Sequence, residues 1–461
     1  MQQSVIALLK ELRAYALEKS LRAAIYYHEE DSYLMRFANS AISLNTNEHL
    51  VRLQISVYDG NKHADYEMIA DPNQIEPLKR GIDTAAEMAS RAQALSYTPS
   101  IPCYRETVID MQAYDPFLAG ITNPERLEFF NTLARGLETE TIKLSGVFSN
   151  GITITAQIST ESEHSQYFAC TDASITAVLS HQKLKWEVNA LQSAQAKTEL
   201  NPEHLRAELA FLVRQYSQNP AVQLPLGKYT VVFGAAAVGD VLDIFNWVGP
   251  NGGMMKRGYS FLKEEQIGQP VFSPRFTLTD DPHCQATYPV SHDLTGKRRE
   301  RFPLFEAGVL KAFFWSQDDA DEFGREATGH SVYHNNLVLS GGEKEVGSLE
   351  ELAALPREED ILYIPYIHYM NIVNPTAGIF TGSSRFGALL LRKDGSVTVP
   401  YNVRVTQSFE DLFGERLEWL SREQCAHNVS LSYGERNPRA IWVPRFICVR
   451  GVEISHSNSS Y

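Results

Sequence analysis

Imidazole side chains occur in two short clusters that could carry chemistry. "DDPHC" and "SHD" contain His283 and His292, and "GHSVYHNN" contains His330 and His334, four residues apart. Histidine is a common zinc ligand, but the spacing of the first cluster fits no standard site, and Asp-Asp-Pro favours a turn. The second pair would share a face only on a helix, whereas its neighbours indicate a loop or strand. We keep these four histidines as alternative metal ligands only.

Two carboxylates lie three residues apart in "VVFGAAAVGDVLDIFNWVGPNGG", residues 231–253. They are Asp240 and Asp243, and on a helix both could face a metal ion. They could equally lie in the first helical turn, where acidic side chains complement the helix dipole. The stretch contains no His, Cys or Glu, and we favour the dipole interpretation.

The common hydrolase and nucleotide-binding motifs are absent. The sequence has no G-x-S-x-G, no H-E-x-x-H and no G-K-[ST] after its Gly pairs. Its five cysteines are far apart and include no C-x-x-C pair, which argues against a zinc ribbon and a redox pair. Scattered thiols are typical of a reducing compartment.

Composition sets further limits on function. The 461 residues are 43% hydrophobic and 21% charged, which is typical of a soluble globular protein with a large core. The net charge of −14 disfavours binding to nucleic acid. The apolar runs are too short to span a membrane, and the first residues lack the apolar segment of a signal peptide. We expect a cytoplasmic protein without nucleic-acid or membrane partners.

The elements that must position these residues divide into two groups. In residues 1–222, predicted hairpins alternate with predicted long helices. One of these helices is predicted to start at Asp71-Pro72, and others at Asn123 and Asn201. A favoured turn pair, Asp59-Gly60, predicts a hairpin. The pattern indicates an α+β domain with helices on one face of an antiparallel sheet. Residues 223–461 follow a linker near 219–229 and predict a β-rich barrel or sandwich-like domain.

Several blocks in this order resemble the TldD/PmbA family, known as modulators of DNA gyrase and regarded as metalloprotease-like. The blocks are "VVFGAAAVGDVL", "RGYSFLKEEQIGQPVFSPRFTLTDDP", "GVLKAFFWSQDDADEFGREATGH", "VNPTAGIFTG", "GALLLRKDGSVTVP" and "VRVTQSFEDLF". They extend over the second half of the chain, and the first half fits the family's layout of helix, hairpins and long helices with looser motifs.

The resemblance implies where a zinc site would lie. Active members carry H-E-x-x-x-H on the helix after the "VVxG" strand, and a late Cys completes the site. We align the family motif with this chain on residues 231–234 and Gly239. The first His of the motif then falls at Asp243, the Glu at Ile244 and the second His at Val248. The late Cys would fall at residues 430–432, which contain none. Zinc hydrolysis needs about three protein ligands and a general base, and these positions supply one carboxylate at most.

The resemblance therefore implies the PmbA (TldE) branch, which lacks the zinc motif. We expect a non-catalytic subunit with no catalytic, cofactor-binding or metal-binding residues of its own, with zinc only in a TldD-like partner of a heterodimer. Its substrate would be an extended, unfolded or small peptide, held by strand addition. Two alternatives stay open: a metallopeptidase with relocated ligands, and a homodimeric peptide-binding scaffold.

Overall fold

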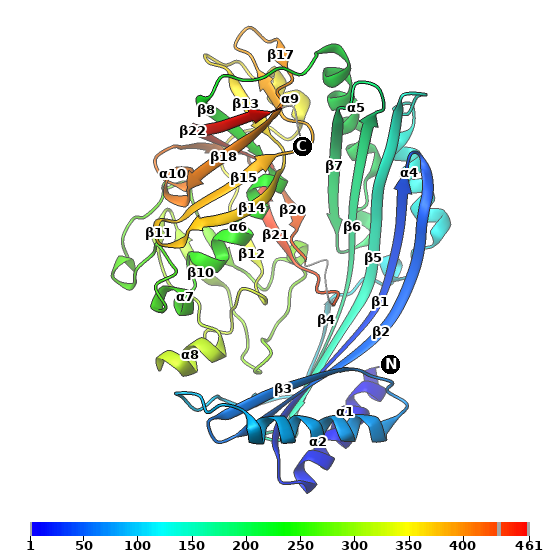
Figure 1. Cartoon of the computed structure of the whole chain (residues 1–461), viewed down its shortest axis with the longest axis vertical. Helices are drawn as coiled ribbons and strands as arrows, with labels where there is room; N and C mark the ends of the chain where they lie inside the picture. The colour runs from blue at the N-terminus through cyan, green and yellow to red at the C-terminus, as the bar shows by residue number, and fades with distance from the viewer. Residues whose placement is uncertain (1, 431–434, 459–461) are drawn as a thin grey trace.

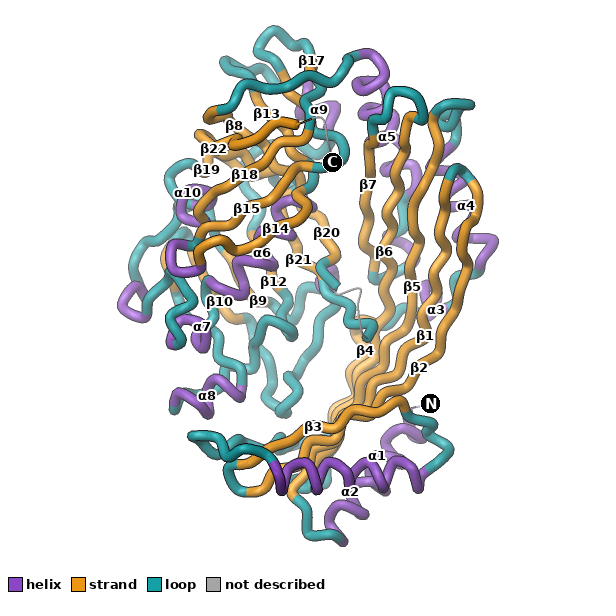
Figure 2. Tube along the Cα trace, in the orientation of Figure 1, coloured by secondary structure: helices purple, strands orange, loops and turns teal. Residues whose placement is uncertain are grey.

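Two β-rich halves face each other in this protein (Figure 1). The structure is a computed structural model and describes residues 2–430 and 435–458. The first half is built on one long, curved antiparallel sheet with helices along it, and the second on two further sheets (Figure 2). No helix in the described part of the chain is long and apolar enough to cross a membrane.

The first half comprises five helices and seven strands among the described residues. The helices are α1 (Gln2–Glu18), α2 (Ile75–Arg91), α3 (Pro116–Ala119), α4 (Asn123–Ala134) and α5 (Pro202–Gln218). The strands are β1 (Arg22–Ala38), β2 (Ala41–Asp59), β3 (Lys62–Ile69), β4 (Val108–Ala113), β5 (Ile142–Ser159), β6 (Ser165–His181) and β7 (Glu187–Ala194). They form one sheet in the order β3-β2-β1-β5-β6-β4, with β7 also paired to β6.

All of these helices cover one face of the sheet, as the sequence predicts. Along β1 most odd-numbered side chains are buried on that face: Tyr27 packs in the core under α1 and α2, and Met35 packs in the core that includes α4 and α5. Because side chains alternate along a strand, the even-numbered ones point to the opposite face. That face carries His28 and Glu30, and it is turned toward the second half.

The second half begins with a strand that leads directly into a helix, as predicted. Its helices are α6 (Ala235–Val248), α7 (Gly252–Lys256), α8 (Gln317–Phe323), α9 (Leu349–Ala354) and α10 (Phe409–Phe413). One sheet has the order β11-β10-β9-β12-β21-β20, and its strands are β9 (Leu278–Asp280), β10 (Phe302–Glu306), β11 (Val309–Leu310), β12 (Leu337–Leu339), β20 (Gln424–Asn428) and β21 (Ala440–Pro444).

The other sheet of this half has nine strands in the described residues. Its order is β14-β15-β18-β22-β8-β13-β16-β17, with β19 also paired to β22. The strands are β8 (Gly227–Gly234), β13 (Ile361–Ile364), β14 (Ile367–Asn374), β15 (Ile379–Ser384), β16 (Leu389–Leu391), β17 (Val397–Thr398), β18 (Asn402–Ser408), β19 (Leu417–Leu420) and β22 (Phe446–Asn458). The β-rich prediction is confirmed, but the barrel alternative is wrong: the described strands form two open sheets.

Local predictions of elements mostly match the structure. Gly60 has a φ of +61° at the turn between β2 and β3, the left-handed conformation that glycine adopts without strain. Asn201 caps α5 by accepting a hydrogen bond from the His204 amide. The start predicted at Asp71 is wrong, since α2 begins at Ile75. The Asp71 carboxylate instead binds the Asn73 amide in the preceding turn.

The hydrophobic core joins the two halves. One cluster contains side chains of α4 and α5 together with Val232, Tyr363, Leu389 and Cys448 from the nine-stranded sheet. The part of the first-half core that includes α5 therefore packs against a sheet of the second half, and this contact fixes the position of one half relative to the other.

Candidate functional site

Helix α6 is held in place by an aromatic cluster. Phe245, on one side of the helix, packs against six phenylalanines: Phe261, Phe272, Phe276, Phe305, Phe409 and Phe413. Val241 and Leu242 are buried in the same core. The other side of α6 faces β20 and β21, and it carries Asp240 and Asp243.

Asp240 is hydrogen-bonded to a histidine of β20. His427 Nε2 lies 2.7 Å from Asp240 Oδ1. The imidazole reaches the helix because position 239 is a glycine: a Cβ there would lie 2.5 Å from His427 Cδ2. The sequence alone gave no reason to single out His427, although it lies two residues after Cys425 and thus on the same side of a strand.

Asp243, at the first His position of the implied zinc motif, is bound by an arginine. Arg439 Nη2 donates to Asp243 Oδ1 at 2.6 Å, and the exposed fractions of the two side chains are 5% and 24%. Burial raises the pKa of Asp243, and the nearby Arg439 guanidinium opposes that rise. The Arg439 guanidinium therefore occupies the position beside this carboxylate where a metal ion would bind.

The dipole interpretation of these two carboxylates is wrong. Helix α6 begins at Ala235 and has no acidic residue in its first turn. Asp240 and Asp243 lie in later turns, where the positive end of the dipole no longer acts on them. Their partners are a residue of β20 and the residue just before β21, which follow about 190 residues later in the chain.

The two other motif positions hold apolar residues, and these residues contact apolar side chains. Ile244 packs against the core around the aromatic cluster, and Val248 is buried within it. Neither offers a lone pair to a metal or to a water molecule. Ser430 lies at the start of the segment where a late Cys would fall. Its hydroxyl donates a hydrogen bond to the Arg439 carbonyl and accepts one from the Arg439 amide. Positions 431 and 432 lie outside the described residues.

The four alternative histidines lie in separate environments. His283 is exposed in the predicted turn, where its amide binds Asp281. His292 lies near Ser291 and Glu106, and His330 is buried against Asp280. Burial lowers the pKa of His334 to about 4. Among residues 2–430 and 435–458, no three His, Cys, Asp or Glu side chains are grouped so that they could hold a metal ion.

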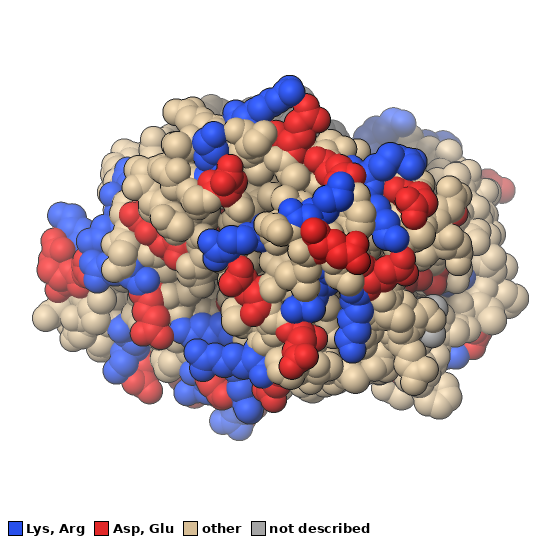
Figure 3. Space-filling model, turned by 90° about the horizontal axis from the view of Figure 1, so that it is seen from below, with Lys and Arg blue, Asp and Glu red and all other residues tan. Residues whose placement is uncertain are grey.

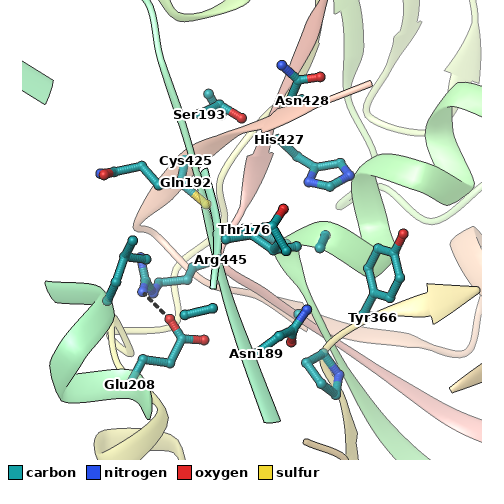
Figure 4. A pocket seen from close by; sticks show the side chains of 18 of the residues that line it. Thr176, Asn189, Gln192, Ser193, Glu208, Tyr366, Cys425, His427, Asn428 and Arg445 are labelled. Carbon is teal, nitrogen blue, oxygen red and sulfur yellow. Dashed lines mark ion pairs between the residues drawn. The ribbon is translucent and has the colours of Figure 1, made fainter. Parts of the chain in front are cut away.

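A cavity of about 300 Å³ lies beside α6, between the two halves (Figure 4). Its walls are β6, β7 and α5 on one side, and β20 with the junction of β8 and α6 on the other. The lining is rich in polar side chains, including Thr176, Asn189, Gln192, Ser193, Tyr366 and Asn428. Asp240 and His427 also line it.

Buried charges at one end of the cavity come from both halves. Arg445 lies 3.8 Å from Glu208 of α5, and it also contacts His204. Burial raises the pKa of Glu208, and burial together with Arg445 lowers the pKa of His204. Burial also raises the pKa of the Cys425 thiol to about 11, so this cysteine is not a thiolate nucleophile near neutral pH.

Two strand edges border the same cavity. In the described residues, β7 pairs only with β6, and β20 pairs only with β21. Residues 189–193 of β7 and 425–428 of β20 line the cavity. An extended peptide can add as a strand to an edge that is not paired, and here the two edges also contact each other.

Charge is distributed evenly over the face seen in Figure 3. Lys and Arg side chains alternate with Asp and Glu, and no extended area of one sign is visible on that face. The negative net charge of the chain is therefore not gathered into a patch there.

Comparisons with known proteins place this geometry in a family. Residues 226–456, about half of the chain, match the model of the PmbA/TldA metallopeptidase C-terminal domain. No curated protein matches the chain.

Solved structures match over almost the whole chain. TldE from Thermococcus kodakarensis has a TM-score of 0.80 at 15% identity and covers 98% of this chain and 100% of its own. A candidate modulator of a DNA gyrase from Thermotoga maritima has a TM-score of 0.76 at 17% identity, with coverages of 97% and 99%. Another candidate gyrase modulator, from Bacteroides thetaiotaomicron, gives 0.74 at 20% identity, with 97% and 98%. At these identities the matches show a shared fold.

Proposed function

Because the chain belongs to the PmbA/TldD family, we propose that it is a non-catalytic, PmbA/TldE-like subunit of a TldD-type zinc metalloprotease. In this role it contributes a peptide-binding wall and a contact surface, and a TldD-like partner carries the zinc. The family model describes a metallopeptidase domain, which supports a role connected with peptide cleavage.

The observation that carries the proposal is the ion pair between Asp243 and Arg439. A zinc ion at this position would lie next to a buried guanidinium bound at 2.6 Å to the one carboxylate available to it. Two cations competing for one carboxylate repel each other strongly in a poorly solvated site. With Ile244 and Val248 in place of base and second ligand, the residues present do not fit a catalytic zinc.

The substrate would be an extended peptide in the cavity between the halves. The unpaired edges of β7 and β20 offer backbone hydrogen bonds, which recognise a peptide without regard to its sequence. Polar side chains on both walls can bind the remaining backbone groups. We also propose a cytoplasmic location, since all five cysteines are unpaired.

Reconstitution with a motif-bearing paralogue tests the proposal. The purified chain alone should contain no stoichiometric zinc by elemental analysis and should not cleave an unfolded peptide. Cleavage should appear when an H-E-x-x-x-H paralogue is added, and a chelator should abolish it. The control is a paralogue with its motif Glu changed to Gln, which should leave the mixture inactive. Chelator-sensitive cleavage by the chain alone, or by the mixture with the altered paralogue, would overturn the proposal.

A further inference from the structure

The N-terminal end of α6 opens into the cavity without a cap. Its N-cap residue is Gly234, which has no side chain to bind the first amides, and its first turn has no acidic residue. Ala237 donates its amide to the carbonyl of Pro365 at 3.2 Å. The amides of Ala235 and Ala236 have no acceptor within a helix at their positions, and both residues line the cavity. A helix of 14 residues presents partial positive charge there.

Two buried polar side chains next to this end also lack partners. The exposed fractions of Tyr363 and Asn189 are 3% and 6%, and both line the cavity. In the described part of the chain, neither the Tyr363 hydroxyl nor the Asn189 amide group has a hydrogen-bond partner. The Tyr363 hydroxyl lies 3.1 Å from where a Cβ of Gly234 would be, directly beside the helix end. Their polar atoms are open to the cavity rather than sealed in the core, so they can donate hydrogen bonds to a group that is bound there.

We propose that this end of the cavity binds the C-terminal carboxylate of a peptide. The amides of Ala235 and Ala236, the Tyr363 hydroxyl and the Asn189 amide group are the donors. Burial raises the pKa of Tyr363 far above its usual range, which keeps the hydroxyl protonated as a donor. The inference rests on the proposed function, because it places one end of the peptide that the cavity would hold.

The charges around the cavity disfavour a dianion more than a monoanion. Asp240 and Glu208 line the cavity, and each has one cationic or imidazole partner, His427 and Arg445 respectively. A monoanion at the helix end gains from the dipole and from four donors, whereas a dianion such as phosphate would be repelled more strongly by these two carboxylates. The edges of β7 and β20 then lie along the residues that precede the carboxylate.

Matched peptides with a free carboxylate or an amide at the C-terminus test the proposal. Their dissociation constants for the full chain would be measured by fluorescence anisotropy with an N-terminal label. We expect the amide to bind roughly 10- to 100-fold more weakly, the range for loss of charge-assisted hydrogen bonds. Equal binding of both peptides would overturn this inference and leave the proposed function standing. No binding of either peptide would overturn the proposed function itself.

Two variants of equal shape locate the carboxylate. Ala235→Asp places a negative charge at the helix end, and Ala235→Asn is its neutral counterpart. The Asp variant should lose the preference for the acid peptide, while the Asn variant keeps most of it. Both should bind the amide peptide equally, which shows that both are folded. Equal preference for the acid in the two variants would overturn the assignment.

The tyrosine provides an independent measurement. Tyr363→Phe should weaken binding of the acid peptide about 10-fold, the lower end of the range for a hydrogen bond to a charged group, with a smaller effect on the amide peptide. Tyr229→Phe is the control, because that hydroxyl binds the Pro225 carbonyl away from the cavity. Acetate should compete only at much higher concentration than the peptide. Competition by acetate at the peptide's own concentration would assign the site to a free carboxylate and overturn the peptide proposal.

Discussion

His330 shows how a residue type that binds metals can instead complete a buried ion network. Its Nδ1 lies 2.7 Å from Asp280, which also accepts hydrogen bonds from Arg299 and from the Asn336 amide. Although burial raises the pKa of Asp280, these donors outweigh it and hold that pKa below its ordinary value. The carboxylate is therefore ionised in the folded protein and stabilises it.

Replacement of this carboxylate should destabilise the protein in a pH-dependent way. We expect Asp280→Asn to lower the free energy of unfolding by about 3–5 kcal/mol at pH 7, since it leaves Arg299 buried and unpaired. Because the folded pKa of Asp280 lies below the unfolded value of 3.8, its contribution is complete above 3.8 and decreases as the pH falls through the folded pKa. Urea unfolding at several pH values measures the difference from wild type. The control is Asp281→Asn, at a more exposed neighbour, which should cost less. A difference that grows toward low pH would contradict the expectation.

At the residue scale, the sequence predicts which chemistry is missing but not what replaces it. Ile244 and Val248 can be recognised as unable to bind zinc from their types alone. The partner of Asp243 cannot be recognised from the sequence, because Arg439 lies 196 residues away and belongs to no motif. The same holds for Tyr363 and Asn189, whose lack of partners depends on packing that no local pattern encodes.

Helix α6 depends on a glycine at its contact with β20. Alanine normally stabilises a helix relative to glycine by up to about 1 kcal/mol. At position 239, however, the added Cβ would meet His427 Cδ2 at 2.5 Å and His427 Cβ at 2.9 Å. We expect Gly239→Ala to lower the free energy of unfolding by about 1–3 kcal/mol through overpacking. In a His427→Gly background, which removes both of these atoms, the same change should stabilise the protein. Urea unfolding of the four proteins checks this, and an equal loss in both backgrounds would refute it.

Elements were predictable where local signals and packing agree. The β8–α6 unit and the Asn201 cap of α5 follow from apolar periodicity and capping residues. The start of α2 was misplaced because Asp71 forms a turn with Asn73 rather than a cap. The barrel was not distinguishable from two open sheets, since short strands with alternating side chains are compatible with both.

One arginine of the second half adds a polar clamp to the hydrophobic contact between the halves. The Arg436 guanidinium binds both carboxylate oxygens of Asp172 at 2.7 Å, and its carbonyl accepts from His28. Gly151 leaves room for the side chain, because a Cβ there would lie 2.6 Å from Arg436 Nε. This contact joins residues 264 positions apart, and a single sequence contains no signal for it.

Loss of the clamp should loosen the first sheet. We expect Arg436→Ala to lower the free energy of unfolding by about 3–5 kcal/mol, because it leaves Asp172 buried without a partner. Hydrogen exchange should become faster in β5 and β6 around Gly151 and Asp172. Arg436→Lys, which keeps the charge but not the two parallel hydrogen bonds, should give an intermediate effect. Unchanged exchange in these strands would show that the halves are held together elsewhere.

The central position of β22 determines the order in which the protein can be assembled during translation. Strand β22 lies between β8 and β18 in the nine-stranded sheet, although it follows both in the chain. The nascent first half has all the strands of its own sheet once β7 has left the ribosome. The second half must wait with β8 and β18 unpaired on one edge until its last strand arrives. In that interval the emerging polypeptide exposes strand edges, which are the surfaces that chaperones protect from aggregation.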